Sequence, residues 1–340
     1  MSNMTVHEHP GVYSRYDATS VVSALRGGKT IGLAAKATSA AEGKVKALTS
    51  CAEGIATFGE GENMANLLRV LYENGAAAVK AVAVVGGDYA AAFAALRAEE
   101  DIGVLLCDST ELSVQQALRE SAEEASAARC ERICVAAAEE DETVAELIER
   151  AAGINSERVV LAAPGGFAAA AAVAAVIAAG TDPSLPLNGA AVKGVSITSE
   201  NYSDEEIDLL VRGGVTALEV MAGEVSVVRG ITTRTTTAGA ADATWRELTT
   251  ILIVDDVIPA LRNSLRARFA RSKNTTQTRS AIRSQVIVEL ENKKNAEYID
   301  SYGDVSVTAL ESDPTVCVVE FGFAVAHGLN RIYLSAHITV

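Results

Sequence analysis

The chain has 340 residues, of which 49% are hydrophobic and only 4% aromatic, and its formal net charge at pH 7 is −15. Its five cysteines are odd in number and follow no export signal, which argues against a disulfide-stabilised secreted domain and favours a reducing site of synthesis. An apolar run at residues 167–179 is mostly alanine and too short to cross a membrane, so we expect a buried helix and no membrane insertion.

Residues 1–19 are polar and broken by Pro10-Gly11, which predicts an extended N-terminal arm. From about residue 20, short apolar strands alternate with helices of about ten residues, as is typical of parallel βαβ units. We predict strands at 30–35, 79–85, 102–107, 133–137, 159–163, 192–198, 218–221 and 225–231. We predict helices at 63–74, 89–98, 111–128, 142–152, 167–179 and 204–212. The pattern predicts a layered α/β domain over residues 20–231.

The pattern changes at residues 232–239, a threonine-rich stretch that predicts a polar linker. Thr244 and Glu247 then have capping-box spacing before a long helix, which Pro259 is positioned to kink. A second helix is predicted at 277–293, followed by strands 305–310 and 316–325 joined by a four-residue hairpin loop. These elements predict an α+β C-terminal domain over residues 232–325.

Residues 326–340 form a predicted C-terminal arm. Its last ten residues alternate without a break between polar and apolar side chains. Chain ends fray unless something ties them down, so a strand here must pair with the edge of a sheet. The alternation does not decide between the chain's own sheet and that of a neighbouring subunit. The apolar face of this predicted strand consists of Ile332, Leu334, Ala336, Ile338 and Val340.

Charge is unevenly distributed along the chain. Residues 229–294 hold twelve Lys/Arg and six Asp/Glu, a net +6, which leaves −21 for the remainder. This pattern predicts a surface for a negatively charged partner. Nucleic acid is disfavoured, because Phe269 is the one aromatic residue between Trp245 and Tyr298 and it belongs to a predicted apolar helix stripe. An acid-free stretch, residues 257–288, holds the seven cations Arg262, Arg266, Arg268, Arg271, Lys273, Arg279 and Arg283.

Motifs for phosphate and dinucleotide binding are incomplete. Gly28-Lys29-Thr30 resembles the end of a phosphate-binding loop, but Ser23 occupies the position of the required glycine and a strand is predicted to follow. Gly59-Glu60-Gly61 resembles the start of a dinucleotide fingerprint, but its third glycine would fall at Met64. The glycine-rich stretch 164–166 lies between a predicted strand and a predicted helix, so we interpret it as a tight turn.

The sequence also lacks a complete set of residues for a catalytic site or a metal site. All four histidines lie outside the α/β domain, so a nucleophile–histidine or histidine–metal site is not expected there. Cys130 and Cys134 have the spacing of half a metal site, but no second ligand pair follows. We expect no catalytic centre, cofactor or metal. Because layered α/β domains host many activities, an enzyme binding a nucleotide or small molecule remains the alternative.

Three features in order resemble contractile tail sheath proteins of bacteriophages and phage-tail-like bacteriocins. They are His9-Pro10-Gly11-Val12-Tyr13, then Trp245-Arg246-Glu247-Leu248 leading through Arg262-Asn263-Ser264-Leu265, then residues 287–304 with the strands and alternating tail that follow. The resemblance spans nearly the whole chain and is strongest from about residue 236.

This resemblance implies a structural subunit without enzymatic activity or cofactor. Such subunits stack as hexameric rings around a tail tube and contract to drive the tube through the target envelope. The implied partners are further copies of the chain, the tail tube protein, and baseplate and terminator proteins, but no nucleic acid. The implied location is a virion or phage-tail-like particle assembled in the bacterial host cytoplasm.

The resemblance also assigns roles to the arms and to the basic stretch. Both arms would add strands to the C-terminal sheets of neighbours, through Val12 and Tyr13 at one end and the alternating residues 332–340 at the other. The seven cations of the acid-free stretch would face the tube.

Overall fold

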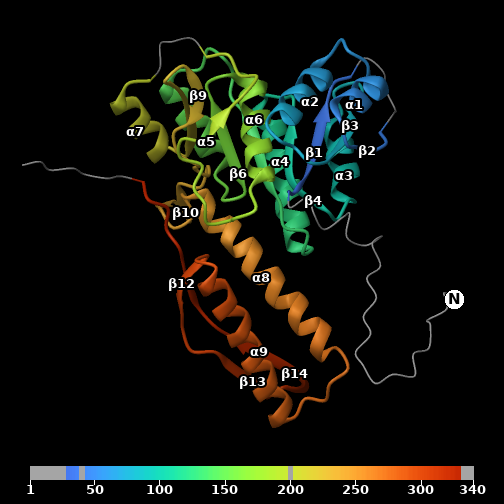
Figure 1. The fold of residues 1–340 in the computed structure, drawn as a ribbon, viewed down its shortest axis with the longest axis vertical. Coiled ribbons are helices and arrows are strands. Elements are labelled where there is room, and N and C mark those ends of the chain that lie inside the picture. The colour runs from blue at the N-terminus through green and yellow to red at the C-terminus, as the bar shows by residue number, and fades with distance from the viewer. Residues whose placement is uncertain (1–27, 38–42, 198–201, 331–340) are drawn as a thin grey trace, which may run out of the picture.

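The computed structural model describes residues 28–37, 43–197 and 202–330, and these form an α/β body with an elongated C-terminal domain (Figure 1). The strands of the body are β1 (Thr30–Ala35), β2 (Lys46–Leu48), β3 (Val79–Ala83), β4 (Ile102–Cys107), β5 (Ile133–Ala137), β6 (Val159–Ala163), β7 (Ala191–Val192), β8 (Val215–Met221) and β9 (Glu224–Val227). They form one sheet in the order β2-β3-β1-β4-β5-β6-β8-β9-β7. The strands from β3 to β8 in this order are parallel. β2 pairs antiparallel with β3 at one end, and at the other end β9 pairs antiparallel with both β8 and β7.

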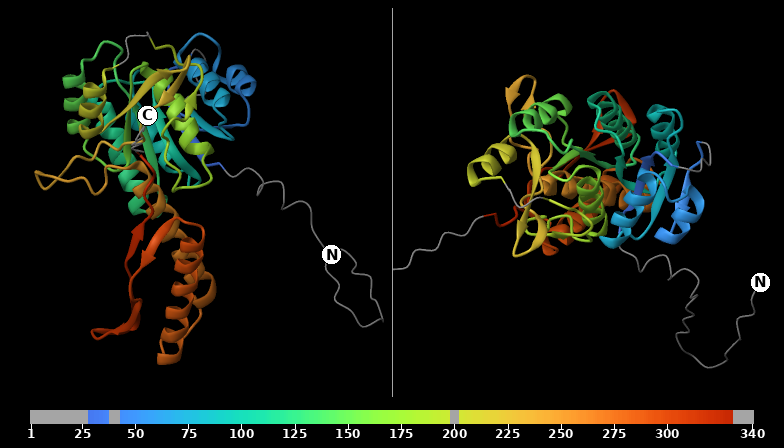
Figure 2. Two further views of the ribbon diagram at one scale, coloured as in Figure 1. Left: turned by 60° about the vertical axis from the view of Figure 1, so that its left-hand side comes forward. Right: turned by 90° about the horizontal axis from the view of Figure 1, so that it is seen from above.

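Helices cover both faces of this sheet (Figure 2). They are α1 (Cys51–Phe58), α2 (Asn63–Glu73), α3 (Tyr89–Arg97), α4 (Leu112–Ala127), α5 (Val144–Ile154), α6 (Gly166–Ala179) and α7 (Asp204–Arg212). Helices α1, α2 and α6 pack on one face, and α3, α4, α5 and α7 pack on the other. The layered α/β prediction is therefore confirmed. Helix α1 was not predicted, although Ser50 and Glu53 have the spacing of its observed cap, in which Ser50 Oγ accepts from Glu53 N.

Helix α6 explains the high alanine content. Every residue from Ala169 to Ala175 is at most 1% exposed, and the helix contacts β1, β4, β5, β6 and β7. Small side chains let its backbone approach the sheet closely. The preceding turn requires glycine for the same reason: Gly165 has a φ of +108°, and a Cβ there would lie 2.8 Å from Val195 Cγ1.

Two predictions about the end of the body are wrong. The strand predicted at 192–198 ends at Val192, because the Asn74 side chain bonds both the backbone N–H and the carbonyl of Lys193. The stretch 232–239 is not a free linker. Thr232 and Thr233 are fully buried, and Thr233 N donates to Val159 O at the start of β6. The strand pair β10 (Thr236–Thr237) and β11 (Ala240–Ala241) then forms a short hairpin on the body.

The C-terminal domain begins with two long antiparallel helices, α8 (Leu248–Phe269) and α9 (Thr276–Asn295). The predicted capping box is wrong, since α8 begins at Leu248 and Thr244 N instead donates to Asp242 Oδ1. Pro259 lies inside α8 and does not end it. The first residues of α8 belong to the core of the body, while Ile253, Val257 and Leu261 belong to a separate core with α9.

The strands of this domain are β12 (Ile299–Tyr302), β13 (Ser306–Leu310), β14 (Asp313–Glu320) and β15 (Phe323–Val325). β12 pairs with β15 and β13 with β14, in a register that makes them one long antiparallel ribbon. Gly303 N donates to Gly322 O (2.8 Å) at the break between the two pairs. The hairpin prediction is confirmed, but its turn is Glu311-Ser312, two residues shorter than expected.

Overpacking α6 tests this account of the fold. We expect Ala172→Leu to lower the free energy of unfolding by about 1–3 kcal/mol, because Ala172 is fully buried. The matched control Ala179→Leu, at the exposed end of the same helix, should change it by about 0.5 kcal/mol or less. Urea denaturation of both variants provides the comparison, and equal destabilisation would contradict the assigned packing.

Candidate functional site

The crevice in which doubly wound sheets bind ligands is filled here by the chain itself. Such a crevice lies beyond the carboxyl ends of the strands where strand order reverses, which in this sheet is between β1 and β4. Asp108 follows β4 and is 3% exposed. Its carboxylate accepts hydrogen bonds from Lys36 N (2.9 Å), Asn63 Nδ2 (2.9 Å) and the Tyr89 hydroxyl (2.8 Å). This arrangement gives no support to the nucleotide-binding alternative.

The structure explains why the incomplete phosphate motif at Gly28-Lys29-Thr30 does not form a phosphate-binding loop. Strand β1 begins at Thr30, so no helix N-terminus follows Gly28-Lys29 to hold a phosphate. Lys29 lies instead at the junction of the body with α8. Burial lowers the pKa of its ammonium group, while Asp255 and Asp256 on α8 act in the opposite direction.

The cysteines are free thiols placed as packing residues. Burial raises the pKa of Cys107 to about 12 and also raises that of Cys134, so both thiols stay protonated near neutral pH. Within residues 28–37, 43–197 and 202–330, no group of three or more His, Cys, Asp or Glu side chains is arranged to hold a metal ion. No helix in the described part of the chain has the length and apolar character to cross a bilayer.

An ion pair that sequence reasoning missed fixes the C-terminal domain to the body. Arg158, just before β6, donates two hydrogen bonds to the Asp255 carboxylate on α8, at 2.9 and 3.0 Å. Both side chains are largely buried, at 13% and 7% exposure. Burial raises the pKa of Asp255 even though Arg158 opposes that shift. Ninety-seven residues separate the two partners, so no local pattern identifies the pair.

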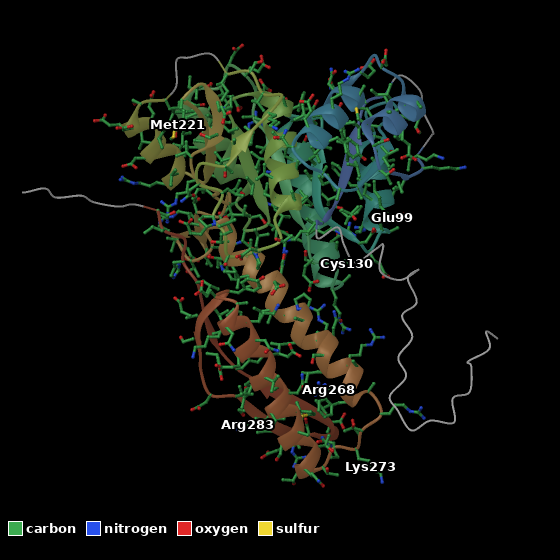
Figure 3. The ribbon with its side chains drawn as sticks, in the orientation of Figure 1. Glu99, Cys130, Met221, Arg268, Lys273 and Arg283 are labelled. Atoms are coloured by element: carbon green, nitrogen blue, oxygen red, sulfur yellow. The ribbon has the colours of Figure 1, made fainter. Side chains whose placement is uncertain are left out.

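The seven cations of the acid-free stretch do not share one environment. Arg262 pairs with Glu131 of the body (2.6 Å), Arg279 donates to Asn274, and Arg283 donates to the Val305 carbonyl. The side chains of the other four make no hydrogen bond or ion pair with any described residue and are exposed; they belong to Arg266, Arg268, Arg271 and Lys273. We call these four the basic tip. Figure 3 shows Arg268 and Lys273 at the distal end of the C-terminal domain, away from the body.

A groove lies beside the basic tip. Its walls come from the α8–α9 turn and the β13–β14 end of the ribbon, and its volume is about 610 Å³. The residues that line it include Phe269, Lys273, Ile282, Pro314 and Cys317. Asn274 fixes the two walls together, because its amide donates to the carbonyls of Pro314 and Val316. The distal end thus combines positive charge with a partly apolar hollow.

The ribbon has unpaired strand edges. Each of its four strands pairs with one other strand in the described part of the chain, so each has one free edge. Helix α9 covers one face of the ribbon, where Val305 is buried. Leu310 and Val316 are 40% and 38% exposed near the turn. Free edges with exposed apolar side chains are suited to accepting further strands.

After β15 the chain leaves the ribbon and returns to the body. Gly328 lies against Pro186, and the Asn330 side chain accepts a hydrogen bond from Asn188 (2.7 Å). Leu185 and Leu329 are 67% and 73% exposed and line one groove there. The predicted arm residues Val12, Tyr13, Ile332, Leu334, Ala336, Ile338 and Val340 lie outside the described residues.

Family comparisons match most of the chain. A model of the phage tail sheath protein central domain matches residues 83–233, and a model of the phage tail sheath C-terminal domain matches residues 240–339. The fold and these two matches define the class as a sheath subunit. The chain belongs to the phage tail sheath family, and its resemblance to that family is confirmed.

Individual relatives agree with this assignment. The tail sheath protein of Bacillus phage SP01 is 32% identical over 205 residues, covering 56% of this chain and 35% of that protein. The chain thus spans about a third of that relative's length. A chain of the anti-feeding prophage baseplate has the same fold, with a TM-score of 0.71 at 14% identity, covering 98% of this chain and all of the other. A chain of the contracted anti-feeding prophage helical sheath matches with a TM-score of 0.70 at 15% identity, covering 98% and 99%.

Removing one partner of the buried junction pair tests its role. We expect Asp255→Ala to lower the free energy of unfolding by about 3–5 kcal/mol, because it leaves the Arg158 guanidinium buried without its anion. The control Arg262→Gln breaks the more exposed pair with Glu131 and should cost about 0–1 kcal/mol. Chemical denaturation of dilute protein gives both values, and a small effect of Asp255→Ala would show that the junction does not depend on this pair.

Proposed function

We propose that this chain is the polymerising subunit of a contractile tail sheath. Its copies stack as hexameric rings around a tail tube, and contraction of the sheath drives the tube through the target envelope. The observation that carries the proposal is the C-terminal ribbon, in which each strand pairs with one other strand of the described residues and keeps its second edge free of them. The family assignment and the alternating sequence of residues 331–340 agree with it. The chain's role is mechanical and needs no cofactor.

Strand donation supplies the connection between copies. The described chain returns to the body at Asn330, whose side chain accepts a hydrogen bond from Asn188, so the last described residue lies at the body and not at the β13–β14 turn. Ten extended residues reach about 33 Å, far enough to enter an adjacent subunit. There the tail, together with Val12 and Tyr13 of another arm, would widen the two-stranded ribbon into a larger sheet. Backbone hydrogen bonds hold such a sheet while the bodies change position.

The body and its C-terminal domain would move together during contraction. The shared helix α8 and the Arg158–Asp255 pair join them rigidly, so the motion falls to the arms between subunits. A difference of a few kcal/mol per subunit between two lattice arrangements, summed over many copies, is enough to drive such a transition. We infer that the extended sheath is the higher-energy arrangement.

The basic tip is proposed to face the tail tube. It combines four exposed cations with an adjacent groove on a chain that is otherwise acidic. Exposed ion pairs contribute only about 0–1 kcal/mol each, which suits a contact that must be released. Arg262, Arg279 and Arg283 belong to the same proposed surface, although each also binds within the chain.

The wider set of partners follows from relatives. The matched anti-feeding prophage chains come from a baseplate and a helical sheath, so we propose copies of this chain and baseplate proteins as partners. A tail tube protein and a terminator protein complete the set. The proposed location is a virion or phage-tail-like particle, assembled in the bacterial host cytoplasm.

Proline substitution in the C-terminal arm tests strand donation. Proline removes a backbone donor, and neighbouring residues of a strand direct their N–H groups to opposite edges. We expect one of Ser335→Pro and Ala336→Pro to block tubule formation, and deletion of residues 331–340 to abolish it while the monomer stays folded. Ala336→Val is the control. Negative-stain electron microscopy and circular dichroism are the measurements, and long ordered tubules from the truncated protein would refute strand donation.

Charge reversal at the basic tip tests the tube contact. We expect the triple variant Arg266→Glu, Arg268→Glu, Arg271→Glu to bind tubes at least tenfold more weakly, since it replaces three attractive charges by repulsive ones. Its self-assembly without tubes should be unchanged. The triple variant with glutamine is a milder control, and co-sedimentation with purified tubes measures binding. Normal sheathing of tubes by the glutamate variant would show that the tip faces elsewhere.

A further inference from the structure

Three arginines converge on a pocket that the proposed strand donation does not use. Arg212 ends α7, Arg229 follows β9, and Arg246 precedes α8. Together with Asp208, Val211 and Asn330 they line a cavity of about 390 Å³. The three come from separate elements, so the tertiary fold brings their positive charges together.

Two of these three arginines have an ion-pair partner among the described residues, and the third has none there. Arg212 pairs with Asp208 at 3.4 Å, and Arg229 pairs with Glu247. The guanidinium of Arg246 makes no hydrogen bond or ion pair with any residue of the described ranges, and its Nε is shielded from solvent without a partner. A donor left in this state is unfavourable, so the fold retains an arginine that an acceptor would stabilise.

We propose that this pocket binds an acidic side chain of a second copy of the chain. A planar guanidinium matches a carboxylate through two parallel hydrogen bonds, which makes a carboxylate the fitting ligand class. The chain itself supplies the complementary charge, since residues outside 229–294 carry a net −21. The exposed acids of the body include Glu139, Glu140 and Asp141. The inference rests on the proposed polymerisation.

The position of the pocket supports this choice of partner. Asn330, the last described residue before the donated arm, forms part of its wall. A neighbour that receives the arm therefore lies within about 33 Å of the pocket, the reach of ten extended residues. A carboxylate entering it would fix the orientation of the two bodies, which the arm by itself leaves free.

Substitution of Arg246 tests the pocket in the full-length protein. We expect Arg246→Gln to raise the concentration needed for polymerisation at least tenfold, and Arg246→Lys, which keeps the charge without the planar fork, to raise it less. Arg129→Gln is the control, because Arg129 is exposed and has no side-chain partner among the described residues. Sedimentation measures the polymer, and thermal unfolding measures the fold of each monomer.

Trp245 provides a second readout, since it is the single tryptophan of the chain and adjoins Arg246. We expect its emission to shift when wild-type protein and the Arg129→Gln variant polymerise. Polymerisation of Arg246→Gln at the wild-type concentration, or an equal loss of polymer and monomer stability in the glutamine and lysine variants, would overturn the pocket proposal. Failure of the wild-type protein to form tubules would instead overturn the proposed function.

Discussion

Helix α8 belongs to both hydrophobic cores, and this constraint fixes where every C-terminal element lies. Its first turn packs with the α/β body, and the next turns pack with α9 and the ribbon. A continuous helix cannot bend freely between the two cores, because each residue is tied to the next turn by backbone hydrogen bonds. The Arg158–Asp255 pair then fixes the rotation of α8 against the body. The chain therefore presents its ribbon and basic tip in a defined direction.

The two parts of the chain differ in which groups they leave open to other molecules. In the body, Asp108 binds three donors and fills the crevice where related architectures hold ligands. In the C-terminal domain, the ribbon keeps free strand edges and the tip keeps four unpaired cations within the described residues. Groups that the monomer leaves unsatisfied are the ones that other molecules can bind. This contrast separates a stable scaffold from the surfaces that we propose for assembly.

Strong and weak contacts are distributed in a way that fits a moving lattice. The buried junction pair would be costly to break, so it suits a contact that stays intact. The exposed cations and strand edges form contacts that are individually weak and can be exchanged. The Arg246 pocket is intermediate, because its guanidinium is partly shielded and still faces a cavity. Movement would then occur between subunits and not within them.

The sequence by itself determined the layered α/β body, the two long helices and the hairpin that follows them, because hydrophobic period and chain order encode local structure directly. It did not predict β12, which pairs with β15 to complete the ribbon. Pattern also identified the basic stretch, but it could not show that Arg262 is paired with Glu131 while the Arg268 side chain has no partner in the described part of the chain. The sequence pattern also misassigned residues 232–239 as a linker. Two threonines in this stretch are buried and form hydrogen bonds with backbone groups far away in the chain. Only the tertiary structure decided these points, since the partners lie far apart in the chain and periodicity carries no information about which distant groups meet.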